Sequence, residues 1–279
     1  MARFGISSHL FHEARLDREH LVHIAAHGFE AVEVCATRSH FDYRDPAVVS
    51  ALAEWLSDTR LTLHALHAPR AAGRRDGRWV EPLSNASGDT RRRAAAVDET
   101  LAALEVARRV PFRFLVVTPG APDRAADADD RADLAGRSLE TIAARAGELG
   151  VQVAVELGPG GLGAADTLAQ LVEERLEGLD VGVCLDYGHA HLGGDLADAV
   201  ETLSGHVVTT HVHDNRGRRD EHLVPFAGGI DWDAALMTTQ KVGYDGLFVL
   251  EVDGGHDALD VLRRAEAACG RLEQRFISF

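Results

Sequence analysis

Eight short apolar runs alternate with segments of helical period along this chain, and no other feature limits its fold as strongly. The runs are rich in Val, Leu and Ile and cover residues 3–8, 31–36, 61–68, 113–118, 151–157, 181–186, 207–214 and 247–252. Helical spacing of apolar residues is clearest over 17–28, 91–110, 133–150 and 257–272. Strands that alternate with helices predict a parallel sheet, and continuous apolar runs suit strands buried on both faces.

The number of these units favours a closed barrel over an open sheet. Eight strand–helix units without a linker or a break in composition indicate a single (β/α)8 TIM barrel, one domain over residues 1–279. A doubly wound open sheet needs a glycine-rich phosphate turn after its first strand, but residues 7–12 read SSHLFH. Gly28, Gly150 and Gly243 each precede a strand, at positions where glycine is expected to end a helix.

The charge balance and the cysteines restrict the partners and the compartment. The chain carries 29 Lys plus Arg against 44 Asp plus Glu, a net charge of −15, so no nucleic-acid partner is expected. Three cysteines, Cys35, Cys184 and Cys269, lack C-x-x-C spacing, which is typical of reduced thiols in a cytoplasmic protein. Neither a signal peptide nor an apolar run of about 18 residues is evident, so no membrane partner is expected.

Polar residues occur at the ends of four consecutive predicted strands, where the active sites of such barrels lie. Glu156 and Asp186 end the fifth and sixth strands, and His211 and Glu251 lie on the seventh and eighth. The residues two positions earlier, which face the same way, are Ala154, Cys184, Thr209 and Val249. These are small enough to line a barrel interior, so we expect the four polar side chains to converge in the barrel mouth.

Three converging carboxylates repel one another and raise each other's pKa values unless a cation neutralises them. Together with one imidazole they form a set of oxygen and nitrogen ligands of hard-to-borderline character. The pattern therefore predicts one divalent metal, Mn²⁺, Mg²⁺, Co²⁺ or Zn²⁺, as the cofactor. No organic cofactor is expected.

The motifs VELGPGG, LDYGHAHLGGD, THVHDN…DEHLVPFAGGIDW and LEV occur in this order between residues 155 and 252. Their order resembles the xylose isomerase-like TIM barrel superfamily, and the resemblance extends over essentially the whole chain. That superfamily includes sugar phosphate isomerase/epimerase-like proteins, ketohexose 3-epimerases, inosose isomerases and endonuclease IV-type nucleases. The resemblance implies that Glu156, Asp186, His211 and Glu251 hold the metal, the same four residues that the strand-end argument selects.

Further positions match the superfamily. His189, three residues after Asp186, resembles a histidine that contacts a substrate oxygen in the epimerases and a further zinc in the nucleases. His67, Asp220 and His222 match nuclease zinc ligands, so they are candidates for a second metal or for substrate binding. Thr118 stands where the nucleases have a histidine, which would leave their first zinc short of a ligand.

Other residues of the 210–232 segment are expected to shape the loop. Asp214 is predicted to orient a neighbour or to cap the turn. His213 shares the direction of His211 but lies further into the loop, where a histidine on the rim is an equal alternative. Gly228 and Gly229 permit a tight turn before Asp231, the predicted N-cap of the next helix.

The implied reaction is isomerisation or epimerisation of a small carbohydrate-like substrate: a sugar, a cyclitol or a related polyhydroxy carbonyl compound. In the resembling epimerases two metal-bound glutamates on opposite sides of the sugar move the proton. Here these would be Glu156 and Glu251, with His189 orienting a substrate oxygen. The candidate substrate-binding residues on the loops are His9, His12, Arg38, His40, Trp79 and Arg216.

The long segment 69–89 leaves two interpretations open. Trp79 fits either stacking on a sugar or local packing. The arginines of this segment fit either a phosphate clamp or a solvated loop, of which the solvated loop is favoured because no glycine-rich helix start lies beside them. They are Arg70, Arg74, Arg75 and Arg78.

Three alternative functions compete with the isomerase. A lyase or dehydratase acting on an oxidised sugar would use the same metal and base. An endonuclease IV-like phosphodiesterase on abasic DNA is favoured by His67, His189, Asp220 and His222, and disfavoured by Thr118 and the acidic charge. A barrel that only binds sugar is disfavoured because all four strand-end ligands are present. The sequence leaves the oligomeric state open, and a homo-oligomer is one alternative by analogy with relatives, which often form dimers or tetramers.

Overall fold

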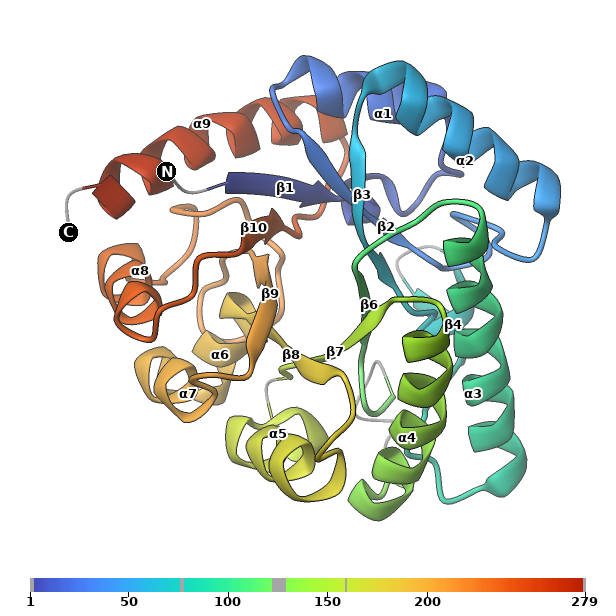
Figure 1. The fold of residues 1–279 in the computed structure, drawn as a ribbon. Helices are drawn as coiled ribbons and strands as arrows, with labels where there is room; N and C mark the ends of the chain where they lie inside the picture. Colours follow the sequence, from blue (N-terminus) through green and yellow to red (C-terminus); the bar gives the residue numbers. More distant parts are fainter. Residues whose placement is uncertain (1–2, 76–77, 122–128, 159, 278–279) are drawn as a thin grey trace.

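Eight parallel strands close on themselves in the order β1–β10–β9–β8–β7–β6–β3–β2 (Figure 1). The computed structural model describes residues 3–75, 78–121, 129–158 and 160–277. The barrel strands are β1 (Arg3–Ser7), β2 (Ala31–Cys35), β3 (Thr62–His67), β6 (Phe114–Val117), β7 (Gln152–Glu156), β8 (Val181–Asp186), β9 (Val207–Val212) and β10 (Leu247–Leu250). The predicted TIM barrel is confirmed, and all eight predicted strands are found, β8 with the predicted bounds and the other seven with slightly shorter ones.

Helices surround the barrel as an outer ring (Figure 1). They are α1 (Arg18–Ala26), α2 (Pro46–Thr59), α3 (Thr90–Leu104), α4 (Ala132–Glu148), α5 (Ala165–Gln170), α6 (Tyr187–Gly193), α7 (Leu196–Thr202), α8 (Trp232–Lys241) and α9 (Ala258–Ile277). Short turns of 3₁₀ helix, η1 (Ser8–Phe11), η2 (Glu105–Arg108) and η3 (Gly161–Gly163), and one π turn, η4 (Leu171–Arg175), complete the elements. The four helices predicted most clearly correspond to α1, α3, α4 and α9.

Glycine ends the helices where the sequence predicts it. Gly28, Gly150 and Gly243 adopt φ values of 79°, 70° and 80°, the left-handed region that side chains disfavour. Each lies two residues after the end of its helix, and the next strand follows within a few residues. The chain therefore reverses direction sharply enough for the following strand to enter the barrel.

Two apolar layers hold the barrel together. A small inner cluster of Ala65, Phe114, Val116, Ala154 and Cys184 fills the barrel interior. A much larger core packs the outward faces of the strands against the helices. The inner cluster is made mostly of small side chains, as expected for Ala154 and Cys184. Polar side chains two residues further along β7 and β8 can therefore converge above it.

The segment 69–89 is not the irregular loop that the sequence suggested. It contains an antiparallel hairpin, β4 (Ala71–Arg75) and β5 (Arg78–Pro82), that forms a separate two-stranded sheet. Arg74 lies opposite Trp79 in this hairpin, and the backbone N–H of Arg74 donates a hydrogen bond of 3.1 Å to Ser39 Oγ. This bond attaches the hairpin to the loop that follows β2.

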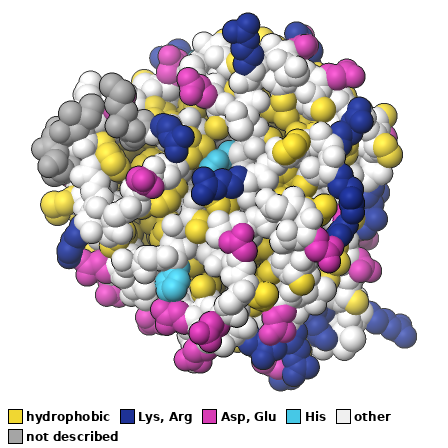
Figure 2. Space-filling view, in the orientation of Figure 1, with side chains coloured by type: hydrophobic (Ala, Val, Ile, Leu, Met, Phe, Trp, Pro, Cys, Tyr) yellow, Lys and Arg dark blue, Asp and Glu magenta, His cyan; other side chains and the backbone are white. Residues whose placement is uncertain are grey.

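The surface agrees with the acidic composition. Figure 2 shows Asp and Glu side chains interspersed with Lys and Arg on the face that Figure 1 views. Among the described residues, no helix is both long and apolar enough to cross a membrane.

Aromatic packing on the outside of β10 generates a stability prediction. Phe248 is 2% exposed and its ring centroid lies 5.3 to 6.4 Å from those of Phe4, Tyr187, Tyr244 and Phe276. Phe248→Ala should lower the free energy of unfolding by about 3–5 kcal/mol, because it leaves a cavity between the barrel and α9.

Urea unfolding followed by circular dichroism measures this loss. Met237, which is 52% exposed, provides the control, and Met237→Ala should change stability by less than about 0.5 kcal/mol. Equal effects of the two substitutions would contradict the assigned packing.

Candidate functional site

Three carboxylates surround one ring nitrogen of His211 at the mouth of the barrel. His211 Nδ1 lies 3.0 Å from Glu156 Oε1, 3.3 Å from Glu251 Oε2 and 3.8 Å from Asp186 Oδ2. All four side chains are at most 1% exposed. Asp186 and His211 are register partners of β8 and β9, so neighbouring strands deliver them at the same height. The structure thus brings together the four residues that the sequence analysis selected.

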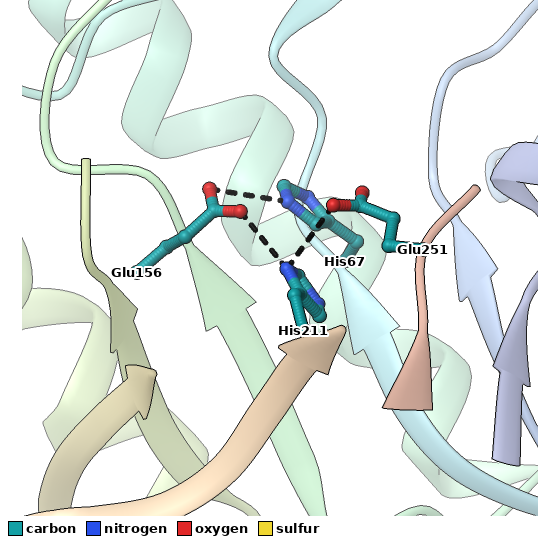
Figure 3. A group of neighbouring side chains, drawn as sticks. All are labelled: His67, Glu156, His211 and Glu251. Carbon is teal, nitrogen blue, oxygen red and sulfur yellow. Dashed lines mark hydrogen bonds and ion pairs between the residues drawn. The ribbon is translucent and has the colours of Figure 1, made fainter. Parts of the chain in front are cut away.

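His67 joins three of these residues in a group of four possible ligands. One ligand atom each from His67, Glu156, His211 and Glu251 lies within 4.8 Å of the others. Figure 3 shows Glu156 and Glu251 approaching from opposite sides, with the two imidazoles between them. The sequence analysis grouped Asp186 with these residues and left His67 for a second site. In the structure His67 lies in this group, and Asp186 also lies close to His189 and His213.

Hydrogen bonds fix the direction of both imidazoles. His67 Nδ1 donates to the backbone oxygen of Ala68 at 2.9 Å, which leaves Nε2 facing Glu156. His211 Nε2 donates to Glu33 Oε2 at 3.0 Å, which leaves Nδ1 facing the carboxylates. Metal-binding histidines commonly donate their second N–H to a carboxylate or a carbonyl in this way.

Glu33 is a site residue that the sequence analysis missed. It lies within β2, is completely buried, and accepts a second hydrogen bond of 3.0 Å from Ser7 Oγ. The sequence does contain an indication of this role. Glu33 is a single charged residue inside the apolar run AVEVCA, and burying such a charge is costly unless it has a partner.

The electrostatics of the group fit a cation. Burial alone would raise the pKa of Glu156 and of Glu251. The neighbouring histidines outweigh burial, His67 most strongly at Glu156 and His211 at Glu251, and hold both pKa values well below the usual range. Glu251 Oε2 and His67 Nε2 are buried and make no hydrogen bond among the described residues. Two carboxylates with lowered pKa values and buried ligand atoms that make no hydrogen bond match the needs of a divalent ion.

A second polar cluster lies beside the first. Asp220 Oδ2 is 3.1 Å from Nε2 of both His189 and His222. Burial opposes protonation of these rings. Asp186 and Asp220 nevertheless raise the pKa of His189 to about 10, and Asp220 raises the pKa of His222 to about 9. His189 and His222 therefore flank the carboxylate of Asp220 with their pKa values raised, and His67, the third residue predicted for a second metal or substrate, lies in the first group instead.

His213 is completely buried, so the alternative of a rim histidine is wrong. Its Nε2 lies 3.0 Å from Asp186 Oδ1, and its ring stacks on that of His222 with centroids 4.1 Å apart. The ring packs directly over Gly188, where any Cβ would overlap it. Glycine at this position therefore allows His213 to reach the site, and the sequence alone gave no indication of this packing.

Asp214 organises the loop after β9, in agreement with its predicted role. Its carboxylate accepts hydrogen bonds of 2.9 to 3.1 Å from four N–H groups in the loop and at the start of α8. The donors are the backbone of Asn215, Phe226 and Ile230 and the indole of Trp232. Asp231 caps α8 as predicted by accepting from the backbone of Asp233 and Ala234.

The predicted substrate-binding residues divide into two sets. His9, His12 and Trp79 line a pocket that also contains His67 and Glu251.

The structure places the other three predicted substrate-binding residues outside this pocket. Arg38 lies 3.6 Å from Asp42, and Arg216 pairs with Glu221 at 2.6 Å. Both ring nitrogens of His40 are engaged internally, with the backbone oxygen of Ala14 and with Ser8 Oγ. The conformations of the loops determine where these three side chains lie, and the periodicity of the strands gives no information about loop conformation.

A closed (β/α)8 barrel with a histidine–carboxylate group at the C-terminal ends of its strands defines the class of this protein. The family model of the xylose isomerase-like TIM barrel matches residues 21–273, and the chain belongs to this family. An uncharacterized protein of Methanocaldococcus jannaschii is 29% identical over 266 residues, which cover 92% of this chain and 86% of the relative.

Solved structures show the same architecture. A D-tagatose 3-epimerase-like protein superimposes with a TM-score of 0.79 and 25% identity over 98% of this chain and 99% of its own. The IolI protein with a bound zinc atom gives a TM-score of 0.78 at 16% identity over 99% and 100% of the two chains. A D-psicose 3-epimerase gives 0.77 at 17% identity over 98% and 99%.

The Asp214 contacts predict how strongly the loop depends on one carboxylate. Asp214→Asn should lower the free energy of unfolding by about 3 kcal/mol or more, because an amide nitrogen would face N–H donors that the second oxygen now satisfies. Thermal and urea unfolding measure this loss. The exposed Asp245 supplies the control, and Asp245→Asn should change stability by less than about 0.5 kcal/mol. A fully stable Asp214→Asn protein would refute the role.

Proposed function

We propose that this protein is a divalent-metal-dependent isomerase or epimerase of a sugar, a cyclitol or a related polyhydroxy carbonyl compound. The observation that carries the proposal is the placement of Glu156 and Glu251 on opposite sides of the His211 imidazole, inside a buried mouth (Figure 3). The likeness to epimerases among solved structures supports the same reaction type.

The proposed metal ligands are His67, Glu156, His211 and Glu251, with Asp186 3.8 Å from His211 Nδ1 as a further oxygen donor. When bound, a divalent cation acts as a Lewis acid that makes a C–H bond beside the substrate carbonyl more acidic. The residues of the chain then have to move that proton and hold the substrate.

Glu156 and Glu251 are the proposed proton carriers. Both pKa values are lowered, so one carboxylate can accept the proton from the substrate, while the other takes up a proton from solvent and delivers it to the opposite face. The first carboxyl then releases its proton to solvent, which restores both groups. Thr118 Oγ1 donates a hydrogen bond of 2.7 Å to Glu156 Oε2 and fixes its orientation. Glu251 Oε2 has no hydrogen-bond partner among the described residues and lies 3.3 Å from His211 Nδ1.

His189 is the proposed contact to a substrate oxygen. Its Nδ1 donates to the backbone oxygen of Leu157 at 2.8 Å, which holds the ring, and its Nε2 faces Asp220 at the edge of the mouth. A substrate hydroxyl between His189 and Asp220 would find both a donor and an acceptor.

The cluster of His189, Asp220 and His222 keeps an endonuclease IV-like phosphodiesterase as the second candidate, since it offers ligands for another metal. Thr118 weighs against this candidate, because it orients Glu156 through a hydroxyl where the nucleases have a histidine. A lyase or dehydratase would share the base and differ in its product. A cytoplasmic location and a homo-oligomeric state remain predictions.

Metal content tests the proposal first. Elemental analysis of the purified protein should find about one divalent ion per chain, because one compact ligand group is proposed. Glu33→Gln should weaken metal affinity by about 10- to 100-fold, since Glu33 orients the ring of His211 without touching the ion. Competition with a coloured chelator measures this affinity.

The control for this measurement is Glu30→Gln, at an exposed glutamate just before β2, which should leave metal affinity unchanged. Three ions per chain would favour the nuclease candidate. A metal-free protein that binds no added Mn²⁺, Co²⁺ or Zn²⁺ would contradict the proposal.

Proton transfer is tested by solvent deuterium exchange. The metal-loaded protein should introduce deuterium beside the carbonyl of a ketose or an inosose, which nuclear magnetic resonance detects. Glu156→Gln and Glu251→Gln should each reduce the exchange rate on the order of 100-fold or more, with the circular dichroism spectrum unchanged. The exposed Glu148→Gln should retain the full rate. Near-normal exchange in both active-site variants would refute their roles.

A further inference from the structure

The mouth of the barrel continues into a basic pocket beneath the β4–β5 hairpin. His67 and Glu251, two proposed metal ligands, line the same pocket as Arg70, Arg74 and Trp79. Contacts connect the two regions, because His9 lies 3.4 Å from Glu251 and its ring packs against His12 with centroids 4.3 Å apart. The two proposed metal ligands and the two arginines therefore face one common pocket.

The hairpin orients the two arginines together. Arg70 immediately precedes β4 and Arg74 lies within it, and both side chains line the same pocket. Their guanidinium carbons lie 5.3 and 5.1 Å from the ring centroid of Trp79, within range of cation–π attraction. Trp79 thus holds two like charges close to one another at the edge of the pocket.

The positive charge is only partly neutralised. Arg74 Nε lies 3.1 Å from Glu13 Oε1, and the side chain of Glu13 is half exposed. Arg70 forms no ion pair among the described residues, and its buried Nε has no hydrogen-bond partner there. A half-buried guanidinium without a carboxylate is unfavourable unless a ligand supplies the anion.

From this geometry we infer that the substrate carries an anionic group, a carboxylate or a phosphate, which Arg70 and Arg74 bind while its carbonyl end lies at His67 and Glu251. The inference rests on the proposed function and specifies its substrate class. Guanidinium groups bind both carboxylates and phosphates through charged hydrogen bonds. The geometry therefore indicates that the group is negatively charged, and the experiment distinguishes a carboxylate from a phosphate. The arginines of this segment therefore do not all belong to a solvated loop, because Arg75 and Arg78 are exposed and the other two are not.

Three matched ketohexoses test the inference: D-fructose, D-fructose 6-phosphate and D-fructuronate. Their dissociation constants for the metal-loaded protein are measured by calorimetry at fixed ionic strength. At least one anionic ketose should bind about tenfold or more tightly than D-fructose, because a charged hydrogen bond contributes this much. The tighter of the two anionic compounds identifies carboxylate or phosphate as the group that the pocket accepts.

Substitutions in the hairpin test whether the preference for an anionic ketose arises in this pocket. Arg70→Met keeps the aliphatic packing on Trp79 and should abolish the preference for the anion, while leaving the affinity for D-fructose and the metal content unchanged. Arg74→Met should reduce the preference in the same direction and replaces Arg70→Met if that variant does not fold. Arg78→Met, at an exposed arginine of the same hairpin, should retain the full preference.

Equal binding of all three ketoses, no binding of either anionic ketose, or an equal loss in Arg78→Met would each overturn the inference. Solvent deuterium exchange separates this failure from failure of the proposed function. Exchange without an anion preference contradicts the inference alone, and an anion preference without exchange contradicts the isomerase alone.

Discussion

The structure depends on the concentration of negative charge around His211. Glu156, Glu251 and Asp186 place carboxylate oxygens 3.0 to 3.8 Å from one nitrogen, in surroundings from which water is almost excluded. Such a group is stable only with positive charge in its centre, supplied by imidazolium or by a metal ion. The barrel makes this possible, because strands fixed by their hydrogen-bond ladders hold the carboxylates against their mutual repulsion.

The supporting contacts extend outward from this centre. Glu33 holds the far side of the His211 ring, and Thr118 holds Glu156. Asp214 lies in the loop after β9, outside the group around His211. Its four hydrogen bonds nevertheless shape the segment that carries Asp220. At this end of the barrel, some site residues therefore lie on the strands, which are fixed by the sheet, and others lie in loops. A few buried polar groups hold these loops in place.

The periodic part of this architecture could be predicted from the sequence, and the loop part could not. Alternating apolar runs determine the strands, and a two-residue period places Glu156, Asp186 and His211 in the mouth, because side chains two residues apart in a strand face the same way. Arg38, His40 and Arg216 were predicted by proximity in the chain alone, and each proved to have an internal partner. The hairpin was missed although its sequence contains Asp-Gly between two short runs, a common hairpin turn. Glu33 was missed because attention to strand ends overlooked a charge inside a strand.

The hairpin is joined to the barrel by chain connectivity, by the bond to Ser39 and by the ion pair between Arg74 and Glu13, and it shares no ladder with the eight strands among the described residues. Its residues can therefore change in size or charge over evolutionary time without disturbing the register of the barrel. Proteins that inherit the same catalytic floor can in this way acquire preferences for neutral or acidic metabolites by exchanging one small, separately paired flap.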